Sequence, residues 1–166
     1  MRTTWTFHNA EQLLFGRGAV GQLGEIAESL GTRRLLVITD KTLVDAGLVD
    51  QVRAPLAAVD IAVEVFDGGE PEPPLHAVND AIAMATESKP DLLLGLGGGS
   101  NMDIAKAVAV VMAHGGSVKD YAGDQIVPGP IFPLILMPTT AGTGSEVTAA
   151  SVLCDTDAGG KFGILS

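Results

Sequence analysis

A short apolar run meets three consecutive glycines within Asp91–Asp103, and this junction limits the fold more than any other segment. Residues 92–96 are typical of a buried strand, and residues 97–99 supply a tight turn without side chains. Ser100 and Asp103 follow with the spacing of a capping box at a helix start. Free N–H groups at a helix N-terminus attract anions, and glycines let a ligand approach the backbone. The junction therefore predicts a strand, a turn and a helix that bind a phosphate or pyrophosphate.

Apolar runs alternate with segments of helical periodicity along the chain. The runs that predict strands cover residues 35–39, 61–66, 92–96 and 131–137. The segments that predict helices cover residues 19–30, 48–58, 75–87 and 103–113. Two hairpins are also predicted, from residues 5–7 with 12–15 and from residues 151–155 with 161–165. This order predicts an α/β fold, a Rossmann-like parallel sheet flanked by helices, with β-hairpins near both ends and ligands beyond the carboxyl ends of the strands.

Length, charge and cysteine content exclude several classes of protein. The 166 residues suit one domain, 1–166, and acidic residues outnumber basic ones 20 to 10, for a net charge of −10. We therefore expect no nucleic-acid partner, and no binding to an anionic membrane surface because no basic run is present. The single cysteine, Cys154, excludes an intrachain disulfide and is typical of a small core residue in a reducing compartment. No signal-peptide core or run of about 18 apolar residues is present, so we expect a cytoplasmic protein.

Asp40 stands at the carboxyl end of the first predicted parallel strand. An acidic residue there can accept hydrogen bonds from an adenosine ribose and repel a 2′-phosphate, which favours NAD over NADP. It can equally end a strand or cap a turn, and the residue alone leaves both interpretations open. In the standard dinucleotide fingerprint the acidic residue follows the glycines by about 20 positions. Here Asp40 precedes Gly97 by 57 positions, so a plain Rossmann dehydrogenase is a poor match.

A second loop, from Pro138 to Thr148, concentrates hydroxyls and glycines directly after an apolar strand. Threonine and serine hydroxyls can donate to phosphate or ribose oxygens, although such loops also form caps and turns. Two loops of this kind at neighbouring strand ends favour a nucleotide site. A local metal site is not predicted, because His8, His76 and His114 are far apart and none has a ligand partner four residues on.

Together these motifs closely resemble the N-terminal half of the iron-containing (group III) alcohol dehydrogenases. The resemblance covers essentially the whole chain and is carried by Phe15-Gly-x-Gly18, Val37-Ile-Thr-Asp40, Pro71-x-Pro73, Gly97-Gly-Gly-Ser-x-x-Asp103 with Lys106, and Pro138-Thr-Thr-Ala-Gly-Thr-Gly-Ser-Glu-Val-Thr148. It implies the N-terminal domain architecture that dehydroquinate synthases and glycerol dehydrogenases share. In those two related groups the loop that corresponds to residues 139–146 usually has a less similar sequence.

The resemblance also implies which residues bind the cofactor. Asp40 would contact the adenosine ribose, residues 97–100 the pyrophosphate, and the threonines the phosphate and nicotinamide-ribose region. No cofactor contact carries over to Glu72, because some members have Asn there. The full set of implied cofactor-binding residues is Asp40, Gly97, Gly98, Gly99, Ser100, Asp103, Thr139, Thr140, Thr143, Ser145, Val152 and Lys161.

Family members continue into an all-helical domain whose Asp and three His ligands hold Fe²⁺ or sometimes Zn²⁺, which polarises the substrate oxygen during hydride transfer. We expect none of those ligands in this chain, which alone should not complete the reaction. The resemblance implies an NAD(P)-dependent oxidoreductase, with NAD favoured over NADP, that interconverts a small alcohol and an aldehyde or ketone. Without the helical domain, the face that would meet it should be an exposed apolar patch, so we expect a homo-oligomer. Two alternatives stay open, a non-catalytic dinucleotide-binding module and a glycerol dehydrogenase-like member of the same superfamily.

Overall fold

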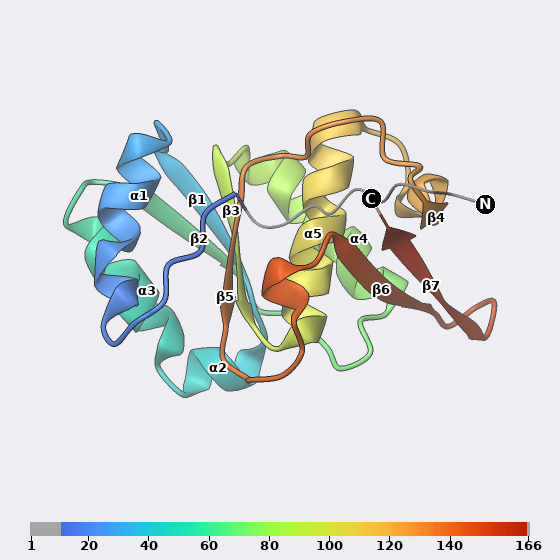
Figure 1. Cartoon of the computed structure of the whole chain (residues 1–166), viewed down its shortest axis with the longest axis horizontal. Helices are drawn as coiled ribbons and strands as arrows, with labels where there is room; N and C mark the ends of the chain where they lie inside the picture. The colour runs from blue at the N-terminus through green and yellow to red at the C-terminus, as the bar shows by residue number, and fades with distance from the viewer. Residues whose placement is uncertain (1–10, 166) are drawn as a thin grey trace, which may run out of the picture.

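Four parallel strands form the main sheet of the computed structural model, which describes residues 11–165 (Figure 1). Their order across the sheet is β2-β1-β3-β5. Every neighbouring pair is parallel, and β1 is hydrogen-bonded to both β2 and β3. The strands are β1 (Arg34–Ile38), β2 (Ala62–Phe66), β3 (Leu92–Gly97) and β5 (Leu134–Pro138). The predicted parallel α/β architecture is therefore confirmed.

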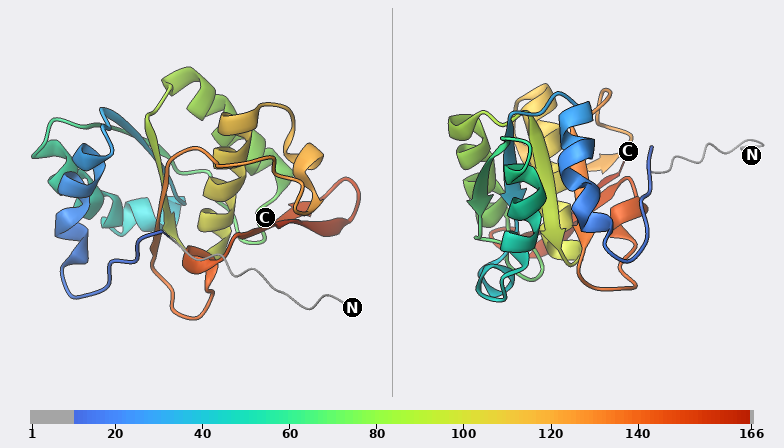
Figure 2. Two further views of the ribbon diagram at one scale, coloured as in Figure 1. Left: turned by 45° about the horizontal axis from the view of Figure 1, so that its top comes forward. Right: turned by 90° about the vertical axis from the view of Figure 1, so that its left-hand side faces the viewer.

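Helices cover both faces of this sheet (Figure 2). Helices α1 and α3 pack on one face with the core around Leu35 and Leu94, whereas α4 and α5 pack on the other with the core around Leu36 and Leu93. No helix in the described part of the chain is both long and apolar enough to cross a membrane. The helices are η1 (Ala19–Gln22), α1 (Leu23–Ser29), α2 (Lys41–Asp45), α3 (Leu48–Ala57), α4 (Leu75–Ser88), α5 (Gly99–His114), η2 (Val118–Tyr121) and η3 (Ser145–Val147).

A second, smaller sheet lies beside α5 (Figure 1). It contains β4 (Gly123–Asp124), β6 (Ala150–Asp155) and β7 (Gly160–Leu165) in the order β4-β7-β6. Strands β6 and β7 pair antiparallel, so the predicted hairpin near the end of the chain is confirmed. Its Leu153 and Ile164 are buried in the same core as α5, which fixes the hairpin to that helix.

The start of α5 differs from the prediction. The helix begins at Gly99, four residues before the expected start at Asp103, and Gly98 is its N-cap with an extended backbone. Ser100 therefore lies inside the first turn and cannot act as the N-cap of a capping box. The predicted capping box is wrong because the glycines themselves enter the helix.

Other boundaries also shift for local reasons. Strand β5 begins at Leu134 instead of 131, because Phe132 N–H donates to the Ala109 carbonyl (3.1 Å) and Pro133 has no N–H to offer a sheet. Residues 12–15 are not assigned to a strand, and residues 5–7, with which they are predicted to pair, lie outside the described residues, so the first hairpin stays a prediction. The predicted helix 19–30 is split into η1 and α1, and α2 was not predicted.

Gly95 in β3 allows α5 to pack directly on the strand. A Cβ atom at this position would lie 2.8 Å from the Ala105 Cβ and 3.3 Å from the Met102 Cα, both on α5. A β-branched side chain needs more room than these contacts leave. The helix that follows the glycine turn is thus placed against β3 by the absence of a side chain.

We predict that Gly95→Val destabilises the fold. Overpacking of a close strand–helix contact should lower the free energy of unfolding by about 1–3 kcal/mol, measured by urea denaturation. The matched control is Gly129→Val, because a Cβ atom at Gly129 meets nothing within 4 Å. Equal denaturation midpoints for the two variants would contradict the close packing of α5 on β3.

Candidate functional site

The two predicted ligand loops meet at the carboxyl edge of the main sheet. The chain leaves β1 towards β2 on one side of the sheet, whereas β3 and β5 lie on the other side, so β1 and β3 form the point where the strand order reverses. Ligands of open parallel sheets bind outside the carboxyl ends of the strands at such a point. Asp40 follows β1 here, and Gly98 follows β3.

The N-terminus of α5 presents backbone donors without side chains in front of them. Among the described residues no side chain caps the helix at Gly98, and the first helical backbone bond runs from Met102 N–H to the Gly98 carbonyl (3.2 Å). The preceding N–H groups of the first turn have no acceptor within residues 11–165 and can bind an anion. The helix has 16 residues, so its dipole adds partial positive charge at this end.

The second predicted loop, Pro138 to Thr148, is called the hydroxyl loop below. It follows β5, contains η3 and lies against the start of α5. A Cβ atom at Gly98 would lie 3.2 Å from the Thr140 Oγ1, and one at Gly99 would lie 3.5 Å from the Thr143 Cβ. Thr139 N–H donates to the Gly97 carbonyl (2.9 Å), which continues the pairing of β5 with β3 into the loop. The two loops predicted from sequence thus form one surface, and glycine keeps the space between them open.

Asp40 has a structural role at the same edge. Its Oδ1 accepts from Leu43 N–H (3.1 Å) and caps α2, so the capping interpretation of this residue holds. Its Oδ2 accepts from the Asn101 Nδ2 (2.7 Å), which also donates to the Leu96 carbonyl (3.1 Å). Asn101 is buried and ties the acidic strand end to the glycine loop. The sequence analysis does not predict a role for Asn101. The one sequence feature that could indicate it is an amide side chain directly after the Gly-Gly-Gly-Ser run.

Asp103 and Lys106 form a buried polar cluster one turn further along α5. The Asp103 carboxylate accepts from the Ser145 hydroxyl (2.7 Å) and from Val152 N–H (3.0 Å). The Lys106 ammonium donates to the Ser145 Oγ (2.8 Å) and the Ala150 carbonyl (2.7 Å), and it lies 3.6 Å from the Asp103 carboxylate. The cluster fastens the hydroxyl loop and the start of β6 to α5.

Burial lowers the pKa of the Lys106 ammonium below its ordinary value, because a charged group loses hydration inside the protein. The negative charges of Asp103 and Glu146 act in the opposite direction without cancelling this effect. Hydrogen bonds to Ser145 and Ala150 therefore hold the Lys106 ammonium in a place where burial disfavours its charge.

A cleft of about 310 Å³ lies between the N-terminus of α5, the hydroxyl loop, the β6–β7 hairpin and the loop before α4. It is lined by Glu72, Pro73, Gly99, Ser100, Asp103, Thr143, Ser145, Val152, Leu153, Cys154 and Lys161. Seven of the twelve residues implied by the resemblance are among them. The other five, Asp40, Gly97, Gly98, Thr139 and Thr140, lie outside this cleft at the β1, β3 and β5 ends.

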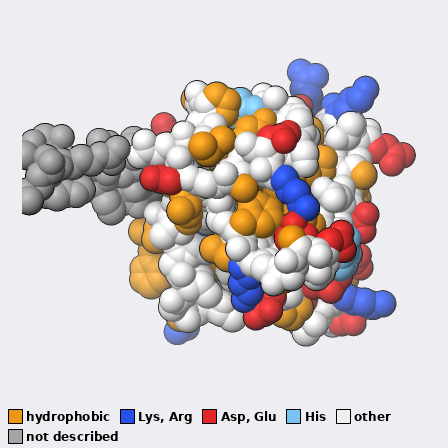
Figure 3. All heavy atoms as spheres, turned by 90° about the vertical axis from the view of Figure 1, so that its right-hand side faces the viewer, with side chains coloured by type: hydrophobic (Ala, Val, Ile, Leu, Met, Phe, Trp, Pro, Cys, Tyr) orange, Lys and Arg blue, Asp and Glu red, His pale blue; other side chains and the backbone are white. Residues whose placement is uncertain are grey.

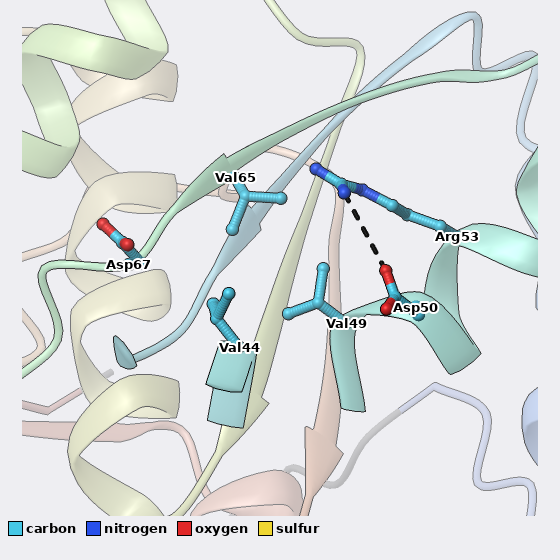
Figure 4. Close-up of a pocket in the computed structure, with 6 residues that line it drawn as sticks. All are labelled: Val44, Val49, Asp50, Arg53, Val65 and Asp67. Carbon is cyan, nitrogen blue, oxygen red and sulfur yellow. Dashed lines mark ion pairs between the residues drawn. The ribbon is translucent and has the colours of Figure 1, made fainter. Parts of the chain in front are cut away.

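A second hollow, of about 210 Å³, lies between α2, α3 and β2 (Figure 4). Its charged side chains are Asp50, Arg53 and Asp67, and Arg53 lies 3.9 Å from Asp50 in the preceding helical turn. None of the predicted site residues lines it. Within residues 11–165 no group of three His, Cys, Asp or Glu side chains is placed to hold a metal ion.

We predict that Lys106→Met weakens the fold. The substitution leaves the Asp103 carboxylate without its cation and the Ala150 carbonyl without its donor, so we expect a loss of about 3 kcal/mol at neutral pH. Urea denaturation measures the loss, and Lys41→Met, at an exposed lysine, is the control.

The pH dependence of this difference has a definite sign. Because the pKa of Lys106 is lowered, the unfolded chain binds more protons than the folded chain between the folded-state pKa and the ordinary value of 10.5. The free energy of unfolding of the unsubstituted chain should therefore rise relative to that of Lys106→Met as pH increases through this window. A difference that falls with pH would show that the pKa is raised instead.

Known proteins with similar sequences belong to the family that the motifs resemble. The sequence profile of the family described as iron-containing alcohol dehydrogenase matches residues 10–166. The long-chain-alcohol dehydrogenase 1 of Geobacillus thermodenitrificans is 48% identical over 141 residues, 83% of this chain and 36% of that protein. The choline dehydrogenase of Bacillus subtilis is 38% identical over 165 residues, 98% of this chain and 41% of that protein.

Solved structures agree with the fold. A crystal structure of 1,3-propanediol oxidoreductase matches with a TM-score of 0.94 at 35% identity, over 98% of this chain and 43% of that chain. The sulfoacetaldehyde reductase of Bifidobacterium kashiwanohense, solved in complex with NAD⁺, matches with a TM-score of 0.85 at 32% identity, over 99% of this chain and 44% of that chain.

The chain thus spans about two fifths of the length of these relatives, and it corresponds to their N-terminal part. The profile match extends over nearly all of the chain, and it includes both glycine-rich loops and the cleft between them. The chain belongs to the iron-containing alcohol dehydrogenase family.

Proposed function

We propose that residues 1–166 form the dinucleotide-binding domain of an NAD-dependent oxidoreductase that interconverts an alcohol and an aldehyde or ketone. The single observation that carries the proposal is the uncapped N-terminus of α5, where glycines leave backbone donors facing the threonines of the hydroxyl loop. The names of the relatives, among them an NAD-dependent methanol dehydrogenase and a lactaldehyde reductase, support the reaction class.

The described residues suit a dinucleotide in charge and shape. Free N–H groups of Gly99 and Ser100 would bind the pyrophosphate, because a helix N-terminus attracts phosphate and a Cβ atom at Gly98 would crowd Thr140. The hydroxyls of Thr140 and Thr143 would donate to phosphate or ribose oxygens.

Asp40 would accept from a hydroxyl of the adenosine ribose, and its charge would disfavour the 2′-phosphate of NADP. Val152 and Lys161 on the hairpin would complete the site, together with Gly97 and Thr139 at the strand ends. Asp103 and Ser145 hold the loop to α5, and their assignment as direct contacts stays a prediction.

NAD bound in this position supplies a nicotinamide that accepts or donates a hydride. The chain's own residues bind and orient it, and the Asp103–Lys106 cluster keeps the hydroxyl loop in place beside it. The described residues do not form a metal-binding cluster that would fit the iron of the family name, so we assign this chain no step that involves a metal.

The proposal also includes self-association and a cytoplasmic location. Phe15 and Leu13 are 96% and 67% exposed, and apolar side chains of this size on a surface favour association with another protein surface. The single cysteine agrees with a reducing compartment.

We predict that Gly98→Val lowers the affinity for NADH by about tenfold or more, because the new side chain would stand between the donors of α5 and Thr140. Isothermal titration calorimetry on the purified chain measures the affinity, and circular dichroism checks the fold. Gly129→Val, which lies in open space, should bind as the unsubstituted chain does. Retained NADH affinity in Gly98→Val would refute the proposed phosphate site.

We also predict that Asp40→Asn relaxes the preference for NAD over NADP by about tenfold. Asparagine removes the charge that would repel a 2′-phosphate and keeps an oxygen that can cap α2, but its NH2 group cannot accept from the Asn101 amide, so circular dichroism checks that the fold is kept. Asp45→Asn removes the same charge from the same helix and serves as the control. Unchanged relative affinities of the two cofactors would remove Asp40 from the site.

A further inference from the structure

An ion pair crosses the edge of the cleft between two segments far apart in sequence. The Lys161 Nζ on β7 lies 2.9 Å from the Glu72 Oε1 in the loop between β2 and α4. The loop is fixed to the hairpin next to this pair, because Cys154 N–H donates to the Pro73 carbonyl (2.9 Å) and Cys154 stands opposite Lys161 in the β6–β7 ladder. Glu72 and Lys161 therefore face one another across the cleft from anchored backbones.

The backbone at Glu72 is in a disfavoured conformation. Its φ is +51°, in the left-handed region where residues with long side chains are uncommon. Pro73 follows it directly, and proline also disfavours a helical backbone in the preceding residue. Backbone strain of this kind persists where the surrounding structure enforces it, and such positions gather at functional sites.

The charges around the cleft are balanced before any ligand binds. Its charged lining residues are Glu72, Asp103 and Lys161, and Asp103 already has Lys106 as its cation. Among the described lining residues Lys161 is the single cation, and Glu72 neutralises it. Acidic and basic side chains also alternate with hydrophobic ones over the molecular face that carries the hairpin (Figure 3). A pyrophosphate at the N-terminus of α5 would be a second anion that attracts the same ammonium.

We propose that Glu72 sets the affinity of the cofactor site by competing with the bound dinucleotide for Lys161. This inference rests on the proposed function, since it takes a dinucleotide as the ligand. When the dinucleotide binds, Lys161 exchanges the carboxylate of Glu72 for the negative charge of the ligand. Glu72 therefore weakens binding and favours release.

The size of the effect follows from exposure. The side chains of Lys161 and Glu72 are 53% and 68% exposed, so water screens their attraction. Exposed ion pairs of this kind correspond to a change in an equilibrium constant of about two- to fivefold. The effect should also shrink in high salt, because the Debye length falls to about 3 Å at 1 M ionic strength.

The test is the dissociation constant for NADH of the purified chain and of its Glu72→Gln variant, measured by calorimetry at low ionic strength. We expect Glu72→Gln to bind NADH about two- to fivefold more tightly. Glu70→Gln is the matched control, because Glu70 lies in the same loop, pairs with His76 instead and does not line the cleft. It removes the same charge and should leave the affinity unchanged.

A double-mutant cycle isolates the competition. In a Lys161→Met background, Glu72→Gln should no longer tighten binding, because the ammonium for which it competes is absent. Three results would overturn the proposal. An unchanged affinity in Glu72→Gln would show that the pair does not compete, and a weaker affinity would show that Glu72 itself binds the ligand. A full effect that persists without Lys161 would show general repulsion by the carboxylate.

This test separates the inference from the function on which it rests. If the unsubstituted chain binds NADH and Gly98→Val does not, the site stands, and the behaviour of Glu72→Gln alone decides the competition. If the unsubstituted chain and Gly98→Val both fail to bind NADH, the proposed dinucleotide site is refuted, and the competition has no ligand to act on.

Discussion

Asp103 and Lys106 share one face of α5, and through their side chains a single helix holds the hydroxyl loop and the β6–β7 hairpin against the parallel sheet. Without these bonds the loop after β5 would have little to fix it, because its threonines are exposed. A buried ion pair gains little net stability from charge alone, but it specifies one geometry since each partner would be left unpaired in any other. The shape of the cleft therefore depends on an interaction in its own wall, because Asp103 and Ser145 both line it.

An acidic chain can still offer a site for an anion when the donors are neutral. The chain has a net charge of −10, yet the edge of the sheet near Gly98 presents backbone N–H groups and threonine hydroxyls beside the carboxylate of Asp40. Such donors carry no net charge, so they do not attract other anions over long distances. Lys161 in the lining of the cleft pairs with Glu72, and Lys106, which does not line it, pairs with Asp103. Selectivity in such a site comes from geometry more than from long-range attraction.

The sequence predicts the strands well and the polar contacts poorly. Strands β1 and β3 are buried on both faces, so their apolar runs show them to within a residue, and the parallel arrangement brings Asp40 and the glycine loop to one edge. The predicted start of α5 is wrong because Ser100 and Asp103 have the spacing of a capping box, whereas the helix already begins at Gly99. The partners of Asn101 and Glu72 lie 61 and 89 residues away, and no local pattern encodes contacts at that range.

The amide of Asn101 occupies a space that two glycines leave open. A Cβ atom at Gly69 would overlap its Oδ1, and one at Gly97 would overlap its Nδ2. A side chain at either glycine would displace the amide from the Asp40 carboxylate. These positions belong to three separate segments, yet a substitution at one removes the reason for the residues at the others. The acidic strand end, the loop before α4 and the glycine turn therefore form one structural unit, in which none of the four residues can be exchanged without affecting the other three.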